Sequence, residues 1–437
     1  MPATTIAAWL IEQEALALLT RLDRVRPFAV HETMVPAAAL APPAQSAIER
    51  FLLGGRRALH QRVHAFLRWL RGPGRTALPS EQQRRFTLIR LQFNDVLSQF
   101  DLFTEVVTQR SEHETGVWLS GLDALAADAL TLAGPYLDPP PVVCYLARGP
   151  GAAIRRARTR LPGGASNPVS IIRVPRERMI GHGIASSLIH EVGHQGAALL
   201  DLVASLRPRL RQARRQTGAA DRQAWRCWER WISEIVADLW SVARLGIGST
   251  LGLLAVVSLP STFVFRPSGD DPHPVPYIRV LLSCGIGNAL YPHPQWATLA
   301  GIWKRLYPTD RVSPGYRRAL SDLERTIGPF VDLLVDHQPP ALKGRSLAEA
   351  LSEAERRPER LLANFASWRR QPAAMAQAPP SLVFATLGQA RAADTLRPEL
   401  ESRVLGNLLT HWALRSTLDI SAICADRTLT LAHRRAS

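Results

Sequence analysis

Residues 186–202, SSLIHEVGHQGAALLDL, contain two histidines four positions apart, with a glutamate directly after the first. In an α-helix, positions i and i+4 lie on one face, so His190 and His194 can direct their imidazoles at one point. Glu191 lies about 100° further around the helix, where its carboxylate can reach a water on a metal without binding the metal itself. The spacing therefore predicts a zinc site on a helix.

The same stretch carries a packing stripe at helical spacing. Its members recur at i, i+4, i+7, i+11 and i+14: Ile189, Gly193, Gly196, Leu200 and Val203. Glycine normally lowers helix stability, so two glycines on this stripe predict that another backbone approaches closely there. We expect the helix to end at Pro208, which cannot continue the backbone hydrogen bonding.

A zinc site needs a third protein ligand, and two spacings could supply it. A histidine at position 200 would give the metzincin pattern, but Leu200 excludes it. Residues 228–246, WERWISEIVADLWSVARLG, place Glu234 and Asp238 on one helix face. Asp221 is a candidate N-cap of this helix and Gly246 a C-terminal stop. Its expected buried stripe holds Trp228, Trp231 or Ile232, Ile235, Leu239 and Val242.

HEVGH at 190–194 followed by SEIVADLWS at 233–241 resembles the gluzincin zinc metallopeptidases. The resemblance implies one Zn²⁺ per chain, with Glu234 as the third ligand beside the two histidines. It also implies that Asp238 fixes the tautomer of a ligand histidine by accepting its second N–H. An ordinary salt bridge from Asp238 to an arginine such as Arg244 is the alternative. The resemblance covers about residues 165–295, and a basic insertion lengthens the segment between the two motifs.

Residues 270–280, DDPHPVPYIRV, resemble the His-Pro plus Arg signature of the membrane-peptidase branch that cleaves prenylated proteins. The resemblance implies that His273, Tyr277 or Arg279 faces the metal from the opposite wall and stabilises an oxyanion. The alternatives are that His273 is an ordinary loop residue and that Arg279 only neutralises Asp238. The multiple membrane spans of that branch are missing from this chain.

Composition narrows the class of protein. The chain has 437 residues, 46% of them hydrophobic and 21% charged, which is typical of a globular protein. The net charge of +16 comes almost entirely from arginines spread along the chain, and no nucleic-acid motif accompanies them, so we do not expect nucleic acid as the partner. Four distant cysteines form no CxxC pair, and the N-terminus lacks the basic start of a secretion signal. These features favour a reducing cytoplasm.

The patterns predict a mainly α fold with a small β-sheet, an α+β zincin-like core flanked by helical regions. The expected segments are an N-terminal helical region at 1–135, the metallopeptidase core at 136–310 and a C-terminal helical region at 311–437. Residues 142–149 and 169–175 are expected strands, separated by a basic helical or looped piece at 152–168. The second strand is either an edge strand that binds extended substrate or a plain internal strand.

One apolar stretch, residues 246–265, is long enough to cross a bilayer. Three glycines, Pro260 and the absence of a second such stretch favour a buried wall of the core. A membrane anchor is the alternative that we do not favour.

The sequence thus predicts a zinc-dependent metallopeptidase with Glu191 as general base and a peptide or protein as substrate. The alternative is a non-catalytic zinc-binding interaction protein with a vestigial peptidase site. A third, lower-ranked hypothesis is a protein that binds nucleic acid or an anionic membrane. The sequence gives no indication of oligomeric state.

Overall fold

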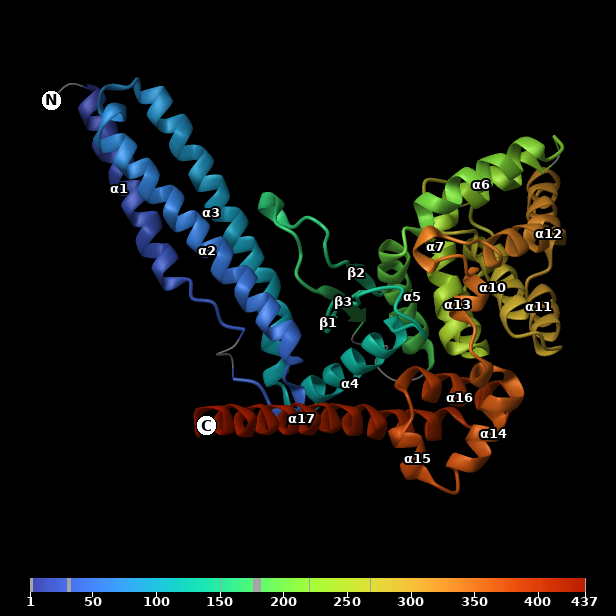
Figure 1. The fold of residues 1–437 in the computed structure, drawn as a ribbon. Helices are drawn as coiled ribbons and strands as arrows, with labels where there is room; N and C mark the ends of the chain where they lie inside the picture. The colour runs from blue at the N-terminus through green and yellow to red at the C-terminus, as the bar shows by residue number, and fades with distance from the viewer. Residues whose placement is uncertain are drawn as a thin grey trace.

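The computed structural model of the protein describes residues 3–29, 33–149, 151–175, 182–219, 221–267 and 269–436. Helices account for 74% of it, and the chain also forms one small three-stranded sheet. Figure 1 shows the sheet between a long N-terminal arm and a larger assembly of helices. The expected fold class, mainly α with a small sheet, is confirmed.

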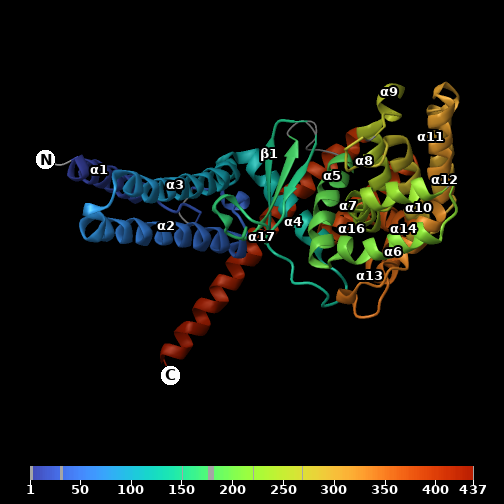
Figure 2. The same ribbon diagram turned by 90° about the horizontal axis from the view of Figure 1, so that it is seen from above.

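Three long helices form the arm: α1 (Ala3–Arg24), α2 (Pro42–Arg71) and α3 (Pro79–Thr108). Proline begins both α2 and α3, a position where its missing N–H costs no hydrogen bond. Apolar side chains on the facing surfaces hold the helices together, as where the rings of Phe66 and Phe86 stack with centroids 5.9 Å apart. Both ribbon views show that most of the arm extends away from the rest of the molecule (Figures 1 and 2).

The sheet has the order β1-β3-β2, with strands β1 (Val142–Ala147), β2 (Ala153–Arg155) and β3 (Ser170–Pro175). Strand β3 pairs in parallel with β1 and antiparallel with β2, so it is the central strand. Of the two alternatives for 169–175, the plain internal strand is confirmed and the substrate-binding edge strand is wrong, because both edges of β3 are already paired. The basic piece at 152–168, expected to be helical or looped, is mostly a loop, but it also supplies the short strand β2.

Alternation along the strands gives the sheet two different faces. Val143 and Ile171 point to one face and belong to the hydrophobic cluster of the arm. Cys144 and Ile172 point to the other face and belong to the main cluster, which includes α4 (His113–Leu130) and α5 (His182–Leu199). Gln195 of α5 accepts hydrogen bonds from the Ala157 N–H and the Ser170 hydroxyl, each at 2.9 Å, and so joins α5 to the sheet.

Helix α5 carries the HEVGH motif and packs closely against α7 (Arg222–Leu245). The prediction of close approach at its glycines is confirmed at Gly193, where a Cβ atom would lie 2.9 Å from the Ala237 Cα. The prediction that the helix runs to Pro208 is wrong. Helix α5 ends at Leu199, Asp201 takes a left-handed conformation with φ of 51°, and Pro208 lies inside α6 (Leu202–Gln216).

Helix α7 is almost entirely buried in its second half. Its expected apolar stripe is confirmed, since Trp228, Trp231, Ile232, Ile235, Leu239 and Val242 are all buried. Gly246 follows the helix with φ of 56° and ends it as expected. Asp221 does precede the helix, but its side chain makes no capping hydrogen bond and instead pairs with Arg325.

The apolar stretch 246–265 forms two helices, α8 (Ile247–Val257) and α9 (Ser261–Val264), separated by Pro260. Helix α8 packs against α5 and α16 (Pro380–Ala392), so the predicted buried wall is confirmed for α8. Leu259 and Phe263 beyond it are exposed. In the described part of the chain, none of the helices combines the length and apolar character needed to cross a bilayer.

The remaining helices surround α7 and α8 or continue to the C-terminus: α10 (Pro276–Leu290), α11 (Gln295–Leu306), α12 (Pro314–Val335), α13 (Leu347–Leu351), α14 (Pro358–Trp368), α15 (Pro372–Gln377) and α17 (Pro398–Ala436). Helix α17 packs along α4 and then continues beyond it (Figures 1 and 2). The main hydrophobic cluster contains residues from all three expected segments, 1–135, 136–310 and 311–437. The packing is continuous across these segments, so their boundaries stay predictions.

A buried ionic group joins the end of α7 to the C-terminal helices. Arg244 and Arg356 are both almost fully buried and both bind the carboxylate of Glu353. Each guanidinium also donates to a backbone carbonyl, Arg244 to that of Thr131 and Arg356 to that of Arg244. One carboxylate therefore compensates two buried guanidinium groups.

A second polar contact joins α6 to the end of α12. His337 is buried, and its Nε2 lies 2.9 Å from the Ser205 hydroxyl. Its Nδ1 lies 3.4 Å from the Arg209 guanidinium. Burial and the Arg209 charge lower the pKa of His337 to about 4, so this imidazole is neutral at pH 7.

Candidate metal centre

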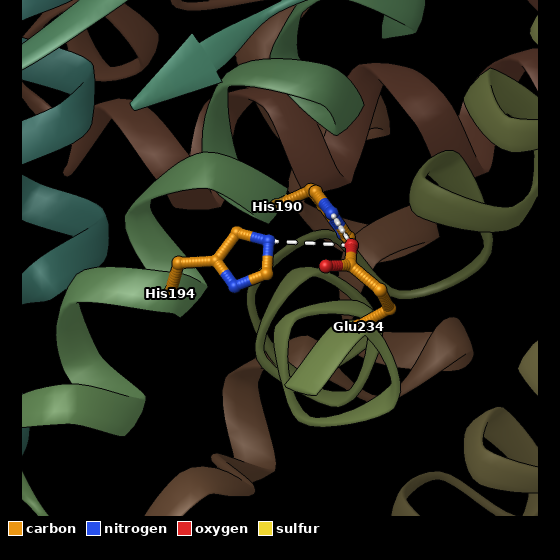
Figure 3. A group of neighbouring side chains, drawn as sticks. All are labelled: His190, His194 and Glu234. Carbon is orange, nitrogen blue, oxygen red and sulfur yellow. Dashed lines mark hydrogen bonds and ion pairs between the residues drawn. The ribbon is translucent and has the colours of Figure 1, made fainter. Parts of the chain in front are cut away.

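Helices α5 and α7 bring His190, His194 and Glu234 together, and one ligand atom from each lies within 4.8 Å of the others. Glu234 Oε2 is 3.2 Å from the Nε2 of His190 and 3.3 Å from the Nε2 of His194. Figure 3 shows the two imidazoles and the carboxylate turned toward one point. This group could hold a metal ion.

The spacing of these atoms fits a tetrahedral ion. Zinc binds histidine nitrogen and carboxylate oxygen at about 2.0–2.2 Å, which places neighbouring tetrahedral ligand atoms about 3.3–3.5 Å apart. The two nitrogen–oxygen separations are 3.2 and 3.3 Å. Two neutral imidazoles and one carboxylate are also a donor set that zinc uses. The donor set and the two nitrogen–oxygen separations are therefore compatible with zinc.

Behind His190, a carboxylate holds the imidazole in place. Asp238 Oδ1 lies 2.8 Å from His190 Nδ1, the contact expected of a residue that fixes the histidine tautomer. The alternative, a salt bridge from Asp238 to an arginine, is also present, but not with Arg244, which pairs with Glu353. Arg279 of α10 instead donates two hydrogen bonds to Asp238, from Nε and from Nη2, both at 2.7 Å. The guanidinium thus neutralises Asp238 and keeps both of its oxygens oriented.

The electrostatics of the group favour a positive charge at its centre. Burial alone would lower the pKa of His190, but the Asp238 carboxylate outweighs burial and raises that pKa to about 9. Burial alone would raise the pKa of Glu234, yet hydrogen bonds from His190, His194 and other groups hold it well below its usual range. The group therefore attracts a cation, either a proton on an imidazole or a metal ion.

His273 reaches the same carboxylate from another direction. It lies in the segment between α9 and α10, and its Nε2 is 3.0 Å from Glu234 Oε2. Its Nδ1 lies 2.7 Å from Asp271, which also accepts the backbone N–H of His273 at 3.0 Å. The hydrogen bond to Glu234 raises the pKa of His273 against the effect of burial. The side chain of His273 remains 42% exposed, so this side of the group is open to solvent.

Glu191 and Tyr277, the two remaining candidate site residues, lie in different places. Glu191 is half-buried on α5, and its charge acts on Arg279 at the back of the group. Among the described residues no hydrogen-bond partner of its carboxylate is found. Tyr277 does not join the group, because its hydroxyl donates to Glu324 at 2.9 Å. The structure thus brings His273, Asp238 and Arg279 to the three candidate ligands and leaves Tyr277 apart.

Sequence reasoning missed Asp271. Its signal was present in the quoted stretch DDPHPVPYIRV, because a carboxylate two positions before a histidine can accept both its backbone and its ring N–H.

Comparisons with protein families, with curated proteins and with solved structures find no match to this chain.

Proposed function

We propose that the protein is a zinc-dependent peptide hydrolase of the gluzincin type, with His190, His194 and Glu234 as the metal ligands. The observation that carries the proposal is the spacing of three donor atoms from two helices, which suits tetrahedral zinc. When bound, zinc would supply a Lewis acid and a water of lowered pKa. A cytoplasmic location and a peptide or protein substrate belong to the same proposal.

Glu191 is the proposed general base. It follows the first ligand directly in sequence and takes no part in the hydrogen bonds that tie up the other carboxylates of the group. Its carboxylate accepts the proton of the attacking water and returns it to the leaving amine. A carboxylate already bound to arginine, such as Asp238, is a poorer base because the guanidinium stabilises its ionised form.

His273 is the proposed stabiliser of the oxyanion that forms on the substrate carbonyl. Asp271 lies 2.7 Å from its Nδ1, and in the protonated imidazole Nε2 would also carry an N–H for the oxyanion. The neighbouring Asp271 carboxylate, which is not a proposed metal ligand, favours that protonated form. Asp238 and Arg279 are positioning residues, because they act through the orientation of His190.

The test compares Glu191→Gln with wild type on zinc content and on cleavage of an internally quenched peptide library. Loss of a general base lowers the rate about 10²–10⁴-fold, while the three ligands and their zinc should be retained. Glu355→Gln is the matched control, since Glu355 is an exposed glutamate outside the group. Full activity of Glu191→Gln would refute the proposal.

One observation favours the second candidate, a non-catalytic zinc site in an interaction protein. His273 lies within 3.0 Å of Glu234 and could serve as a fourth ligand, which would close the position that a catalytic zinc keeps open. His273→Ala separates the two. A catalytic site keeps its zinc and loses turnover in this variant, whereas a closed structural site loses affinity for zinc.

A further inference from the structure

A cavity of about 430 Å³ opens on the face of the sheet that is turned away from α5. Its wall includes Tyr145 of β1, Arg173 of β3 and Leu102 of α3. Tyr145 pairs in register with Arg173, and both lie on the same sheet face as Ile171, which packs with the arm. The sheet therefore separates this cavity from the candidate metal centre. Figure 1 shows the same arrangement, with the arm and α5 on opposite sides of the strands.

Three arginines line the cavity: Arg155, Arg156 and Arg173. In the ranges that the structure describes, none of these guanidinium groups forms an ion pair with a carboxylate. Arg173 lies on the central strand, and its Nε is buried without a hydrogen-bond partner. A buried N–H of a charged group that lacks a partner is costly, and like charges gathered in one concavity repel. An anion in the cavity would remove both costs.

We propose that this cavity binds a phosphomonoester, held by Arg155, Arg156 and Arg173. The planar guanidinium group matches the oxygens of phosphate and can bind them through two N–H groups at once. Three such groups suit a dianion better than a single carboxylate.

The rest of the wall indicates what the phosphate is attached to. The Tyr145 ring and the Leu102 side chain provide an apolar surface beside the arginines. Burial and the nearby Glu105 raise the pKa of Tyr145, so its hydroxyl is a neutral donor at pH 7. The cavity is larger than inorganic phosphate requires, and a nucleoside or another group with an apolar face fits the remaining space.

The position of the cavity also predicts a consequence of binding. Leu102 belongs to the arm, whereas Arg155 lies on edge strand β2 of the sheet. A ligand that contacts both therefore joins the arm to the core. Because it binds the folded protein alone, the ligand raises the melting temperature as its concentration exceeds the Kd.

The experiment measures thermal shift and calorimetric binding with the full chain and four probes at fixed ionic strength. The probes are adenosine monophosphate, a hexose phosphate, inorganic phosphate and succinate. Vesicles that contain phosphatidic acid form a fifth arm, which distinguishes a lipid headgroup from a soluble ester. We expect a phosphomonoester to bind and raise the melting temperature, and succinate to bind at least tenfold more weakly.

Variants make the test specific. Arg155→Gln and Arg156→Gln change exposed side chains, and each should weaken binding by about tenfold through loss of a charge-assisted hydrogen bond. Arg160→Gln is the matched control, because Arg160 is an exposed arginine of the same loop outside the cavity wall. The proposal is overturned if no phosphomonoester binds, or if Arg160→Gln weakens binding as much as the other two.

Discussion

Replacing Gly193 by alanine tests whether the close contact of α5 and α7 sets the geometry of the candidate metal centre. The added Cβ would lie 2.8 Å from the Trp240 Cβ and 2.9 Å from both the Cα and the carbonyl oxygen of Ala237. Carbon atoms pack at about 3.5–4.0 Å, so the helices must separate by about 0.6–1.2 Å. Two of these three contacts are with backbone, which cannot rotate away.

The expected change in the free energy of unfolding is the difference between two opposing effects. Overpacking of a rigid contact costs about 1–3 kcal/mol, and the change from glycine to alanine in a helix returns about 1 kcal/mol. We therefore expect the free energy of unfolding to fall by up to about 2 kcal/mol. Separation of the helices also moves Glu234 away from the two histidines, so zinc affinity should fall by at least about tenfold.

The assay is urea unfolding combined with competition between the protein and a zinc chelator. Gly54→Ala is the matched control, because Gly54 lies in α2 with no atom near the position of an added Cβ. This control should gain about 0.5–1 kcal/mol and leave zinc affinity unchanged. A Gly193→Ala protein as stable as wild type, with the same zinc affinity, would refute the reasoning.

Three further predictions concern other contacts. Asp238→Asn should weaken zinc binding by about 10–100-fold in the chelator competition, because the ligand histidine exchanges a charged acceptor for a neutral amide, and unchanged affinity would contradict this role. Glu353→Ala should lower the free energy of unfolding by about 3–5 kcal/mol, since it leaves two buried arginines without a carboxylate. Glu355 is exposed, so Glu355→Ala should change the free energy of unfolding by less than about 0.5 kcal/mol. The lowered pKa of His337 means that its protonation favours the unfolded chain, so stability should fall as the pH drops from about 6.5 toward 4, by about 2 kcal/mol after allowance for solvent screening. In urea unfolding at pH 7 and pH 4.5, His337→Gln should remove the part of the stability loss that protonation of His337 causes. A stability loss equal to that of wild type would contradict the role of His337.

The sequence predicted which three side chains come together, His190, His194 and Glu234, because helical spacing alone fixes most of their arrangement. His190 and His194 share a helix face, and Glu234 comes from a helix whose apolar stripe determines which side is buried. Asp238 follows from the same argument, one turn beyond Glu234. Arg279 was harder to place, because its role depends on the docking of α10 and no local pattern specifies that docking.

Other features could not be read from local patterns. The end of α5 at Leu199 depends on a left-handed residue, Asp201, which aspartate tolerates but does not require. Pro208 was expected to break a helix, yet it lies in the second turn of α6. The central position of β3 depends on pairing with a three-residue strand that carries no clear sequence signal.

The central claim is that His190, His194 and Glu234 together bind one zinc ion. The most direct measurement is metal analysis of the purified wild type beside His194→Ala and Glu234→Ala, with the fold of each checked by circular dichroism. We predict about one zinc per wild-type chain, a loss of most of it in both variants, and a helical content that stays unchanged. Folded wild-type protein that takes up no zinc, or variants that retain it in full, would contradict the account.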